Sequence, residues 1–194
     1  MPVFAERGDT PRWVGACERR ARWRRRGAIR SARDRMRRAL VVGVASLVFL
    51  LDRFSKSVLP DLLSEGSPRE IIGNTLQLIR SENRGGLFGL FQGSAPILAL
   101  LSLGVVVALL VVHDREGERR PSPLTVATGL LIGGALGNLL DRLTMGYVLD
   151  FIDLGVGTLR FWTFNVADMG ISLGILIMLL SALRSPVGRR QRGR

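Results

Sequence analysis

The chain alternates long apolar runs with shorter segments that hold most of its charges. Four runs stand out: Ala39 to about Leu59, Ala95–Val112, Leu124–Leu140 and about Val166 to Leu183. Each comes close to the roughly 20 residues that a helix needs to cross the hydrocarbon of a bilayer. A soluble domain would instead mix polar and apolar positions at helical or strand period. The pattern predicts an all-α polytopic membrane protein with four transmembrane helices.

The arginines predict on which side each end of the chain lies. The segment before Ala39, the loop His113–Pro123 and the tail after Leu183 are rich in arginine. The loops Pro60–Ser94 and Arg142–Asn165 are less basic for their length. Because basic loops stay in the cytoplasm, both termini are expected there and these two loops outside.

The two outer loops have patterns of their own. Thr75–Ile79 alternates polar and apolar residues and Asn83–Gly89 is rich in glycine, so together they predict a short strand pair. The second loop contains Tyr147–Leu149, Phe151-Ile152 and Phe161-Trp162, which are amphipathic, and aromatic residues favour the membrane interface. We therefore expect a small extracytoplasmic β element and an amphipathic loop.

Composition adds a basic arm to this picture. The 194 residues are 47% hydrophobic and carry a formal net charge of +12, much of it before Ala39. Such an arm could bind nucleic acid. Its position beside the first apolar run favours orientation of that helix and attraction to anionic lipid, so no nucleic-acid partner is expected. The predicted divisions are a cytoplasmic arm (1–38), a membrane-embedded domain (39–184) and a basic tail (185–194).

Cysteine and histidine are too scarce to build a site. Cys17 is the one cysteine, which excludes an internal disulfide and a cysteine metal cluster. His113 is the one histidine, and no HExxH pattern occurs. No metal site is predicted.

Aspartates supply the candidate chemistry. On the predicted topology five of them converge at one depth on the outer side: Asp52, Asp141, Asp150, Asp153 and Asp168. Ionisable groups in or near hydrocarbon are costly and usually face a polar cavity or a partner. The convergence therefore predicts a site near the extracytoplasmic surface.

Each aspartate taken alone has a structural interpretation. Asp52 and Lys56 are spaced to pair along a helix. Asn165 and Asp168 have the spacing of a helix N-cap and its third residue. Asp141 could simply mark the membrane surface. Only their convergence favours a functional site.

One face of the third apolar run supports that site. Gly134, Asn138 and Asp141 follow at i, i+4 and i+7, so a helix places them on one face. Close helix packing would explain Gly133, Gly134 and Gly137, but it would not explain the polar residues.

A transporter or channel that uses the carboxylates as a proton or cation path is the alternative function. It would need polar residues through the membrane, and the run Ala95–Val112 offers only Ser102. A cluster on one side favours chemistry at the surface.

Five segments resemble, in order and spacing, the motifs of bacterial lipoprotein signal peptidase, also called signal peptidase II. They are Asp52–Lys56, Glu82–Phe88, Gly133–Arg142, Gly146–Ile152 and Phe164–Asp168. The second departs from the family pattern, because Gly86 and Leu87 stand where the family usually has two alanines.

The resemblance implies an aspartyl protease of the cytoplasmic membrane. No cofactor is expected for such a reaction, and the chain is expected to be a monomer. It implies diacylglyceryl-modified prolipoproteins as substrates, cut just before the lipidated cysteine, and membrane lipids as surroundings. The catalytic pair would be Asp150 and Asp168. The supporting residues would be Asp52, Lys56, Asn83, Gly85, Gly134, Asn138, Asp141, Arg142, Asn165 and Ala167.

Two adjacent carboxylates suit such a reaction because they do not both ionise easily and so share a proton. Asp168 would lie near a helix N-terminus, where the helix dipole favours negative charge. We therefore expect Asp168 to be the ionised partner and Asp150 the protonated one.

Overall fold

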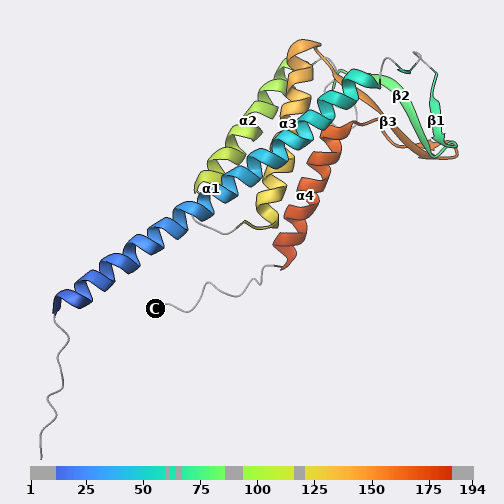
Figure 1. The fold of residues 1–194 in the computed structure, drawn as a ribbon. Coiled ribbons are helices and arrows are strands. Elements are labelled where there is room, and N and C mark those ends of the chain that lie inside the picture. Colours follow the sequence, from blue (N-terminus) through green and yellow to red (C-terminus); the bar gives the residue numbers. More distant parts are fainter. Residues whose placement is uncertain (1–11, 60–61, 64–66, 86–93, 116–120, 185–194) are drawn as a thin grey trace, which may run out of the picture.

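The protein is mostly helical, with a small sheet at one end. The computed structural model describes residues 12–59, 62–63, 67–85, 94–115 and 121–184. The helices are α1 (Arg12–Val58), α2 (Ala95–Arg115), α3 (Pro123–Thr144) and α4 (Val166–Arg184). Figure 1 shows α2, α3 and α4 as a bundle that α1 crosses at an angle.

Three of these helices, α2, α3 and α4, are long and apolar enough to cross a membrane. In α3, 61% of the apolar stretch is buried inside the protein, against 17% in α2 and in α4. α3 is therefore the central helix, and much of α2 and α4 is left to face lipid. The first predicted span lies within α1, where the apolar residues 39–51 are flanked by Arg37-Arg38 and Asp52-Arg53.

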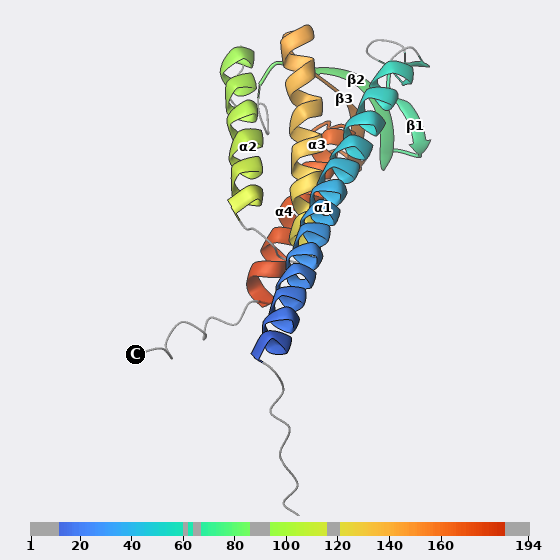
Figure 2. The ribbon, with the colours of Figure 1, turned by 60° about the vertical axis from the view of Figure 1, so that its left-hand side comes forward.

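The first helix begins well before the predicted position. Hydropathy placed its start at Ala39, but α1 begins at Arg12 and continues for 47 residues. The difference arises because hydropathy marks only the part of a helix that can enter lipid. Arginine favours a helix, and α1 contains no proline that would break it. α1 extends well beyond the bundle (Figure 2).

Small residues let the helices pack closely. A Cβ on Gly133 of α3 would lie 2.5 Å from the carbonyl oxygen of Ala45 in α1. A Cβ on Gly134 would collide with the backbone of Ala167 in α4. The glycines of α3 therefore set the distance to both neighbours, and they hold the polar residues of three helices together.

Gly133→Ala is expected to destabilise the protein by about 1–3 kcal/mol, because the new methyl group would overpack the contact with α1. Gly43→Ala is the matched control, since a Cβ there meets nothing within 4 Å and removes a flexible residue from a helix. Thermal unfolding in detergent measures both. Equal melting temperatures would contradict this account of the packing.

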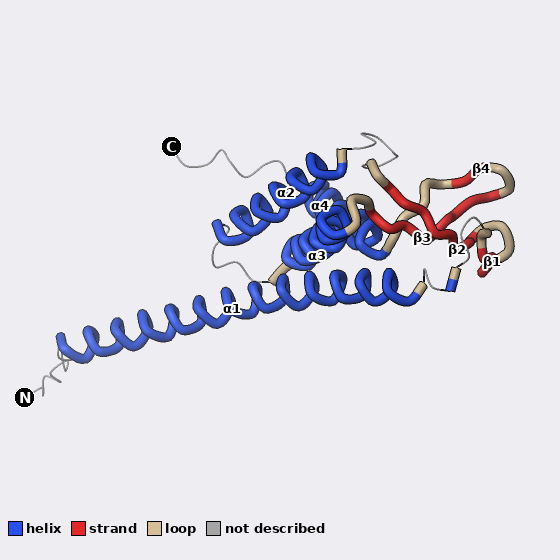
Figure 3. Tube along the Cα trace, turned by 90° about the horizontal axis from the view of Figure 1, so that it is seen from above, coloured by secondary structure: helices blue, strands red, loops and turns tan. Residues whose placement is uncertain are grey.

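The sheet joins the two loops that were predicted to lie outside. Its strands are β1 (Arg69–Ile72), β2 (Leu76–Asn83), β3 (Val148–Val156) and β4 (Leu159–Arg160). They lie in the order β1-β2-β3-β4, and neighbours are antiparallel. Figure 3 shows the sheet beside one end of the helices.

The predicted pairing of Thr75–Ile79 with Asn83–Gly89 is wrong. Residues 76–83 form one strand, which pairs with β1 and with β3; residues 86–89 lie outside the described residues. The expected amphipathic loop is largely β3 and β4. The pairing matters for the site, because the register sets Ser81 opposite Asp150 and Asn83 opposite Val148.

Candidate active site

Gly134, Asn138 and Asp141 share one face of α3, as their spacing predicted, and the structure places this face against α1 and α4. Gly134 packs on the backbone of Ala167. Asn138 donates from Nδ2 to Oδ1 of Asp168 at 2.7 Å. Asp141 is fully buried and forms ion pairs with α1. One face of one helix therefore contacts both neighbours at the end of the bundle that carries the sheet.

The N-terminus of α4 is capped as its sequence predicted. The backbone N–H of Asp168 donates to Oδ1 of Asn165 at 2.9 Å, and the N–H of Asn165 donates to Oδ2 of Asp168 at 3.3 Å. The same Asn165 side chain donates from Nδ2 to Oδ1 of Asp150 at 2.7 Å and to Oδ1 of Asn138 at 3.1 Å. The cap is therefore part of the site, because one asparagine contacts both aspartates.

Asp150 lies on β3 with 1% of its surface exposed. Its carboxylate accepts hydrogen bonds from Asn165 and, at 3.1 Å, from Asn83 on β2. Burial raises the pKa of Asp150 from 3.8 to about 7, and the charge of Asp168 adds to the rise. The two asparagine hydrogen bonds and the charge of Lys56 oppose it. Near neutral pH this carboxyl group can hold a proton.

A buried group of four charged side chains lies beside the pair; we call it the charge cluster. Lys56 Nζ is 2.9 Å from Oδ2 of Asp52 and 2.7 Å from Oδ2 of Asp141. Arg53 contacts the same two acids at 2.9 and 2.5 Å. Oδ1 of Asp52 also accepts the N–H of Ala167 at 3.1 Å, so α1 helps to fix the start of α4. Two acids and two bases leave the cluster neutral.

The residues that directly follow β2 contact α3. Gly85 donates its N–H to Oδ1 of Asn83 at 3.0 Å, and the Gly85 carbonyl accepts from Arg142 of α3 at 3.1 Å. This contact ties the end of β2 to the central helix. The two positions at which the sequence departs from the family pattern, Gly86 and Leu87, lie outside the described residues.

Asp153, one of the five aspartates predicted to converge, lies apart from the pair, and so does the one histidine. Asp153 is paired with Arg160 across the β3–β4 hairpin at 2.6 Å. His113 is at the opposite end of the bundle, near the end of α2, where its carbonyl accepts from Arg37. Among the described residues, no three His, Cys, Asp or Glu side chains are arranged to hold a metal ion.

One residue of the charge cluster was not among the predicted site residues. Arg53 was recognised only as part of a motif, yet it bonds both Asp52 and Asp141. A signal was available, because an arginine directly after an apolar run and an aspartate needs a partner near hydrocarbon.

The arrangement suits proton exchange with a bound substrate. Asp150 and Asp168 come from β3 and α4, and amide groups of asparagines hold both carboxylates in place. Groups fixed in this way can give and take protons at one substrate atom without large rearrangement.

The fold has counterparts among solved structures. One bacterial membrane enzyme matches with a TM-score of 0.71 at 24% identity, covering 79% of this chain and 93% of that one. A second matches with a TM-score of 0.67 at 26% identity, covering 75% and 93%.

The family model "Signal peptidase (SPase) II" matches residues 44–184. A lipoprotein signal peptidase of Syntrophomonas wolfei is 42% identical over 140 residues, which are 71% of this chain and 88% of that protein. One of Anaplasma marginale is 38% identical over 144 residues, 72% of this chain and 82% of that protein. The chain therefore belongs to the signal peptidase II family and is a protease of the lipoprotein signal peptidase class.

Proposed function

We propose that the chain cleaves diacylglyceryl-modified prolipoproteins just before the lipidated cysteine, using Asp150 and Asp168 as an aspartyl pair. The observation that carries the proposal is the position of Asn165. Its side-chain amide is 2.7 Å from Asp150, and its backbone N–H is 3.3 Å from Asp168, so both carboxylates lie around one residue.

In the proposed reaction a water molecule attacks the scissile carbonyl carbon. Asp168 takes a proton from the water, and protonated Asp150 donates its proton to the carbonyl oxygen. The tetrahedral intermediate collapses as its C–N bond breaks, and the leaving nitrogen receives a proton from the pair. The products are the free signal peptide and a lipoprotein that begins with the lipidated cysteine.

The supporting residues have distinct positions in this proposal. Asn138, Asn165 and Asn83 orient the two carboxylates through hydrogen bonds. The charge cluster and Gly134 hold α1, α3 and α4 together beside the pair. Arg142 ties Gly85, just after β2, to α3.

Cleavage of a defined substrate tests the proposal. Purified protein is incubated with a diacylglyceryl-modified prolipoprotein and, in parallel, with the unmodified precursor. We expect mass spectrometry to show a new N-terminus at the lipidated cysteine in the first reaction and intact precursor in the second. Equal cutting of both, or cutting elsewhere, would refute the proposed specificity.

We also propose a four-span topology in the cytoplasmic membrane, with α1 as the first span. Both termini would be cytoplasmic, and the pair would lie near the outer surface, where a lipid-anchored cysteine remains. A reporter fused after Arg184 is expected to be cytoplasmic, and one inserted near Gly66 external. An external C-terminus would overturn this topology.

The pH profile tests the role of Asp150. Its pKa is raised to about 7, so it keeps its proton at slightly acidic pH, where an ordinary aspartate has lost it. If it must donate that proton, the single-turnover rate should fall up to about tenfold per pH unit as pH rises above about 7. Asn83 stabilises the ionised form. Asn83→Ala should therefore move this decline to higher pH, and a shift to lower pH would contradict the assignment.

A further inference from the structure

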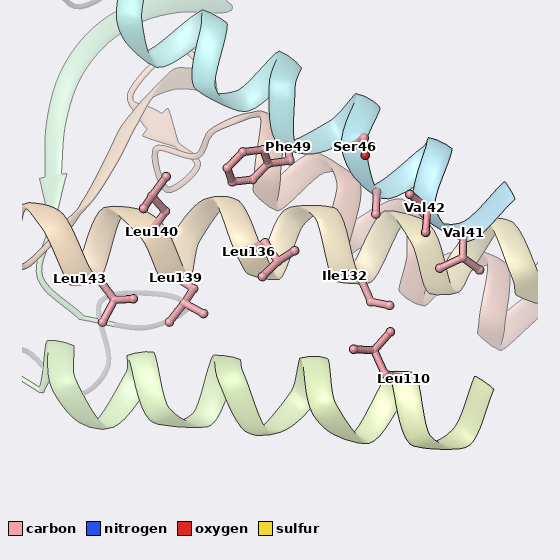
Figure 4. A pocket seen from close by; sticks show the side chains of 11 residues that line it. Val41, Val42, Ser46, Phe49, Leu110, Ile132, Leu136, Leu139, Leu140 and Leu143 are labelled. Atoms are coloured by element: carbon pink, nitrogen blue, oxygen red, sulfur yellow. The ribbon is translucent and has the colours of Figure 1, made fainter. Parts of the chain in front are cut away.

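A lateral groove of about 480 Å³ runs between α1 and α2, with α3 as its floor (Figure 4). The floor includes Ile132, Leu136 and Leu139, and Phe49 and Leu110 stand on the two walls. All of its lining side chains except that of Ser46 are apolar. Its lining therefore suits hydrocarbon and offers little to a polar ligand.

Contacts between α1 and α2 close the groove at one end, and these two helices diverge towards the other end. Away from the site, the guanidinium of Arg37 donates to the carbonyl of His113, and Arg38 pairs with Asp114 at 2.9 Å. Towards the site α1 leans away from α2, as Figures 1 and 2 show. Leu143, which lines that end, is 68% exposed. A long apolar chain could therefore enter the groove from the site-side half of the bilayer.

The length of the groove matches one leaflet. From Ile132 to Leu143 the floor spans 11 residues of α3, or ~16 Å at ~1.5 Å per residue. Half of a hydrocarbon core of ~30 Å is ~15 Å. A single acyl chain of a lipid in the site-side leaflet would extend to about the closed end.

The groove does not face the aspartate pair. Asp141 lies two residues from both Leu139 and Leu143, which is about 200° around a helix of 3.6 residues per turn. The floor is therefore on the face of α3 opposite to the polar residues. This separation favours a lipid of the bilayer over a chain of the substrate as the occupant.

We propose that the lateral groove binds one acyl chain of a bilayer phospholipid from the leaflet on the side of the site. Bound there, the chain fills the space between α1 and α2 and supports their angle on α3. The binding requires only that the bundle is embedded in a bilayer, so it is independent of the reaction proposed above.

Photolabelling of the full chain in lipid nanodiscs tests this site. The probe is a phospholipid with a diazirine midway along one acyl chain, in a large excess of unlabelled phosphatidylglycerol and phosphatidylethanolamine. We expect labels to concentrate on residues 41–49 and 132–143, and to be sparse on exposed Leu173 and Leu176 of α4, which face bulk lipid.

Val42→Trp should fill the groove, and Leu47→Trp is its control. Val42 lines the groove and is 63% exposed, whereas Leu47 is 58% exposed on the same helix outside it. Val42→Trp should lower groove labelling about tenfold, the change expected when roughly two methylene groups lose their contact. Leu47→Trp should leave it unchanged. Ser46→Phe is a second filling variant, should Val42→Trp unfold.

Three results would overturn the proposal. The first is equal labelling of the groove and α4, which would indicate unspecific contact with bulk lipid. The second is unchanged labelling in folded filling variants. The third is displacement of the probe by a diacylglyceryl-cysteine peptide at concentrations where added phospholipid has no effect, which would assign the groove to the substrate.

Discussion

Asp150→Asn or Asp168→Asn is expected to leave a folded, membrane-inserted protein that cleaves almost no lipidated substrate. Asparagine has the shape of aspartate, but it cannot accept the proton of water or share a proton across the pair. Positioned acid–base groups contribute about 10²–10⁴-fold each. We expect either single variant to lose cleavage activity by a factor in that range. The double variant should be about as active as the less active single variant, because the two carboxylates act as a unit.

Asp153→Asn is the matched control for this experiment. Asp153 lies on the same strand, three residues from Asp150, but it is paired with Arg160. Its loss should affect the β3–β4 hairpin and leave most of the turnover. Rates are compared at equal amounts of inserted protein. Near-normal cleavage by either pair variant would eliminate the proposed dyad, even though membership of the family would stand.

The helical spacing of the sequence was enough to predict how α3 contributes to the site. Gly134, Asn138 and Asp141 fall on one face by their period alone, and the structure places that face against α1 and α4. The helix cap formed by Asn165 and Asp168 could be predicted equally well, because these two residues are only three positions apart. Both predictions succeeded because they depend only on residues that are close together in one helix.

The pairing of strands that lie far apart in the sequence could not be predicted in the same way. The alternation of Thr75–Ile79 predicted a strand correctly, but its partner β3 begins some 70 residues later. No local pattern specifies such a partner, since alternation marks a strand without naming its neighbour. The assignment of Asp150 to the pair rested on the family resemblance for the same reason. Its hydrogen bond with Asn83 depends on this strand pairing.

The start of α1 was missed for a different reason. Apolar runs mark only the part of a helix that can enter lipid, and the basic half of α1 has none. Its helicity comes from the absence of proline and from a side chain that tolerates the helix well, which hydropathy does not measure.

Lys56→Met should be the most destabilising of the conservative replacements within the charge cluster. Lys56 has 3% of its side chain exposed, and both of its partners, Asp52 and Asp141, are fully buried. Without the ammonium group, Arg53 faces two acids alone and one negative charge is uncompensated. Breaking a buried ion pair by removing one partner costs about 3–5 kcal/mol. We expect a loss of that size in the free energy of unfolding.

Arg84→Met provides the comparison for a surface pair. Arg84 is 3.0 Å from Glu82, but its side chain is 64% exposed, so the ion pair is worth only about 0–1 kcal/mol. Thermal unfolding in detergent should therefore show a small shift for Arg84→Met and a large one for Lys56→Met. Equal shifts would show that burial does not determine the strength of these pairs.

A second substitution separates charge from packing at Lys56. If the loss is electrostatic, adding Asp141→Asn to Lys56→Met removes the uncompensated negative charge and restores neutrality with Asp52 and Arg53. The double variant should then be more stable than the sum of the two single effects predicts, by about 0.5–3 kcal/mol for residues in contact. If lost packing of the lysine stem is responsible, the two effects will add. Whether this coupling differs from zero decides whether α1 is held at the site by charge or by shape.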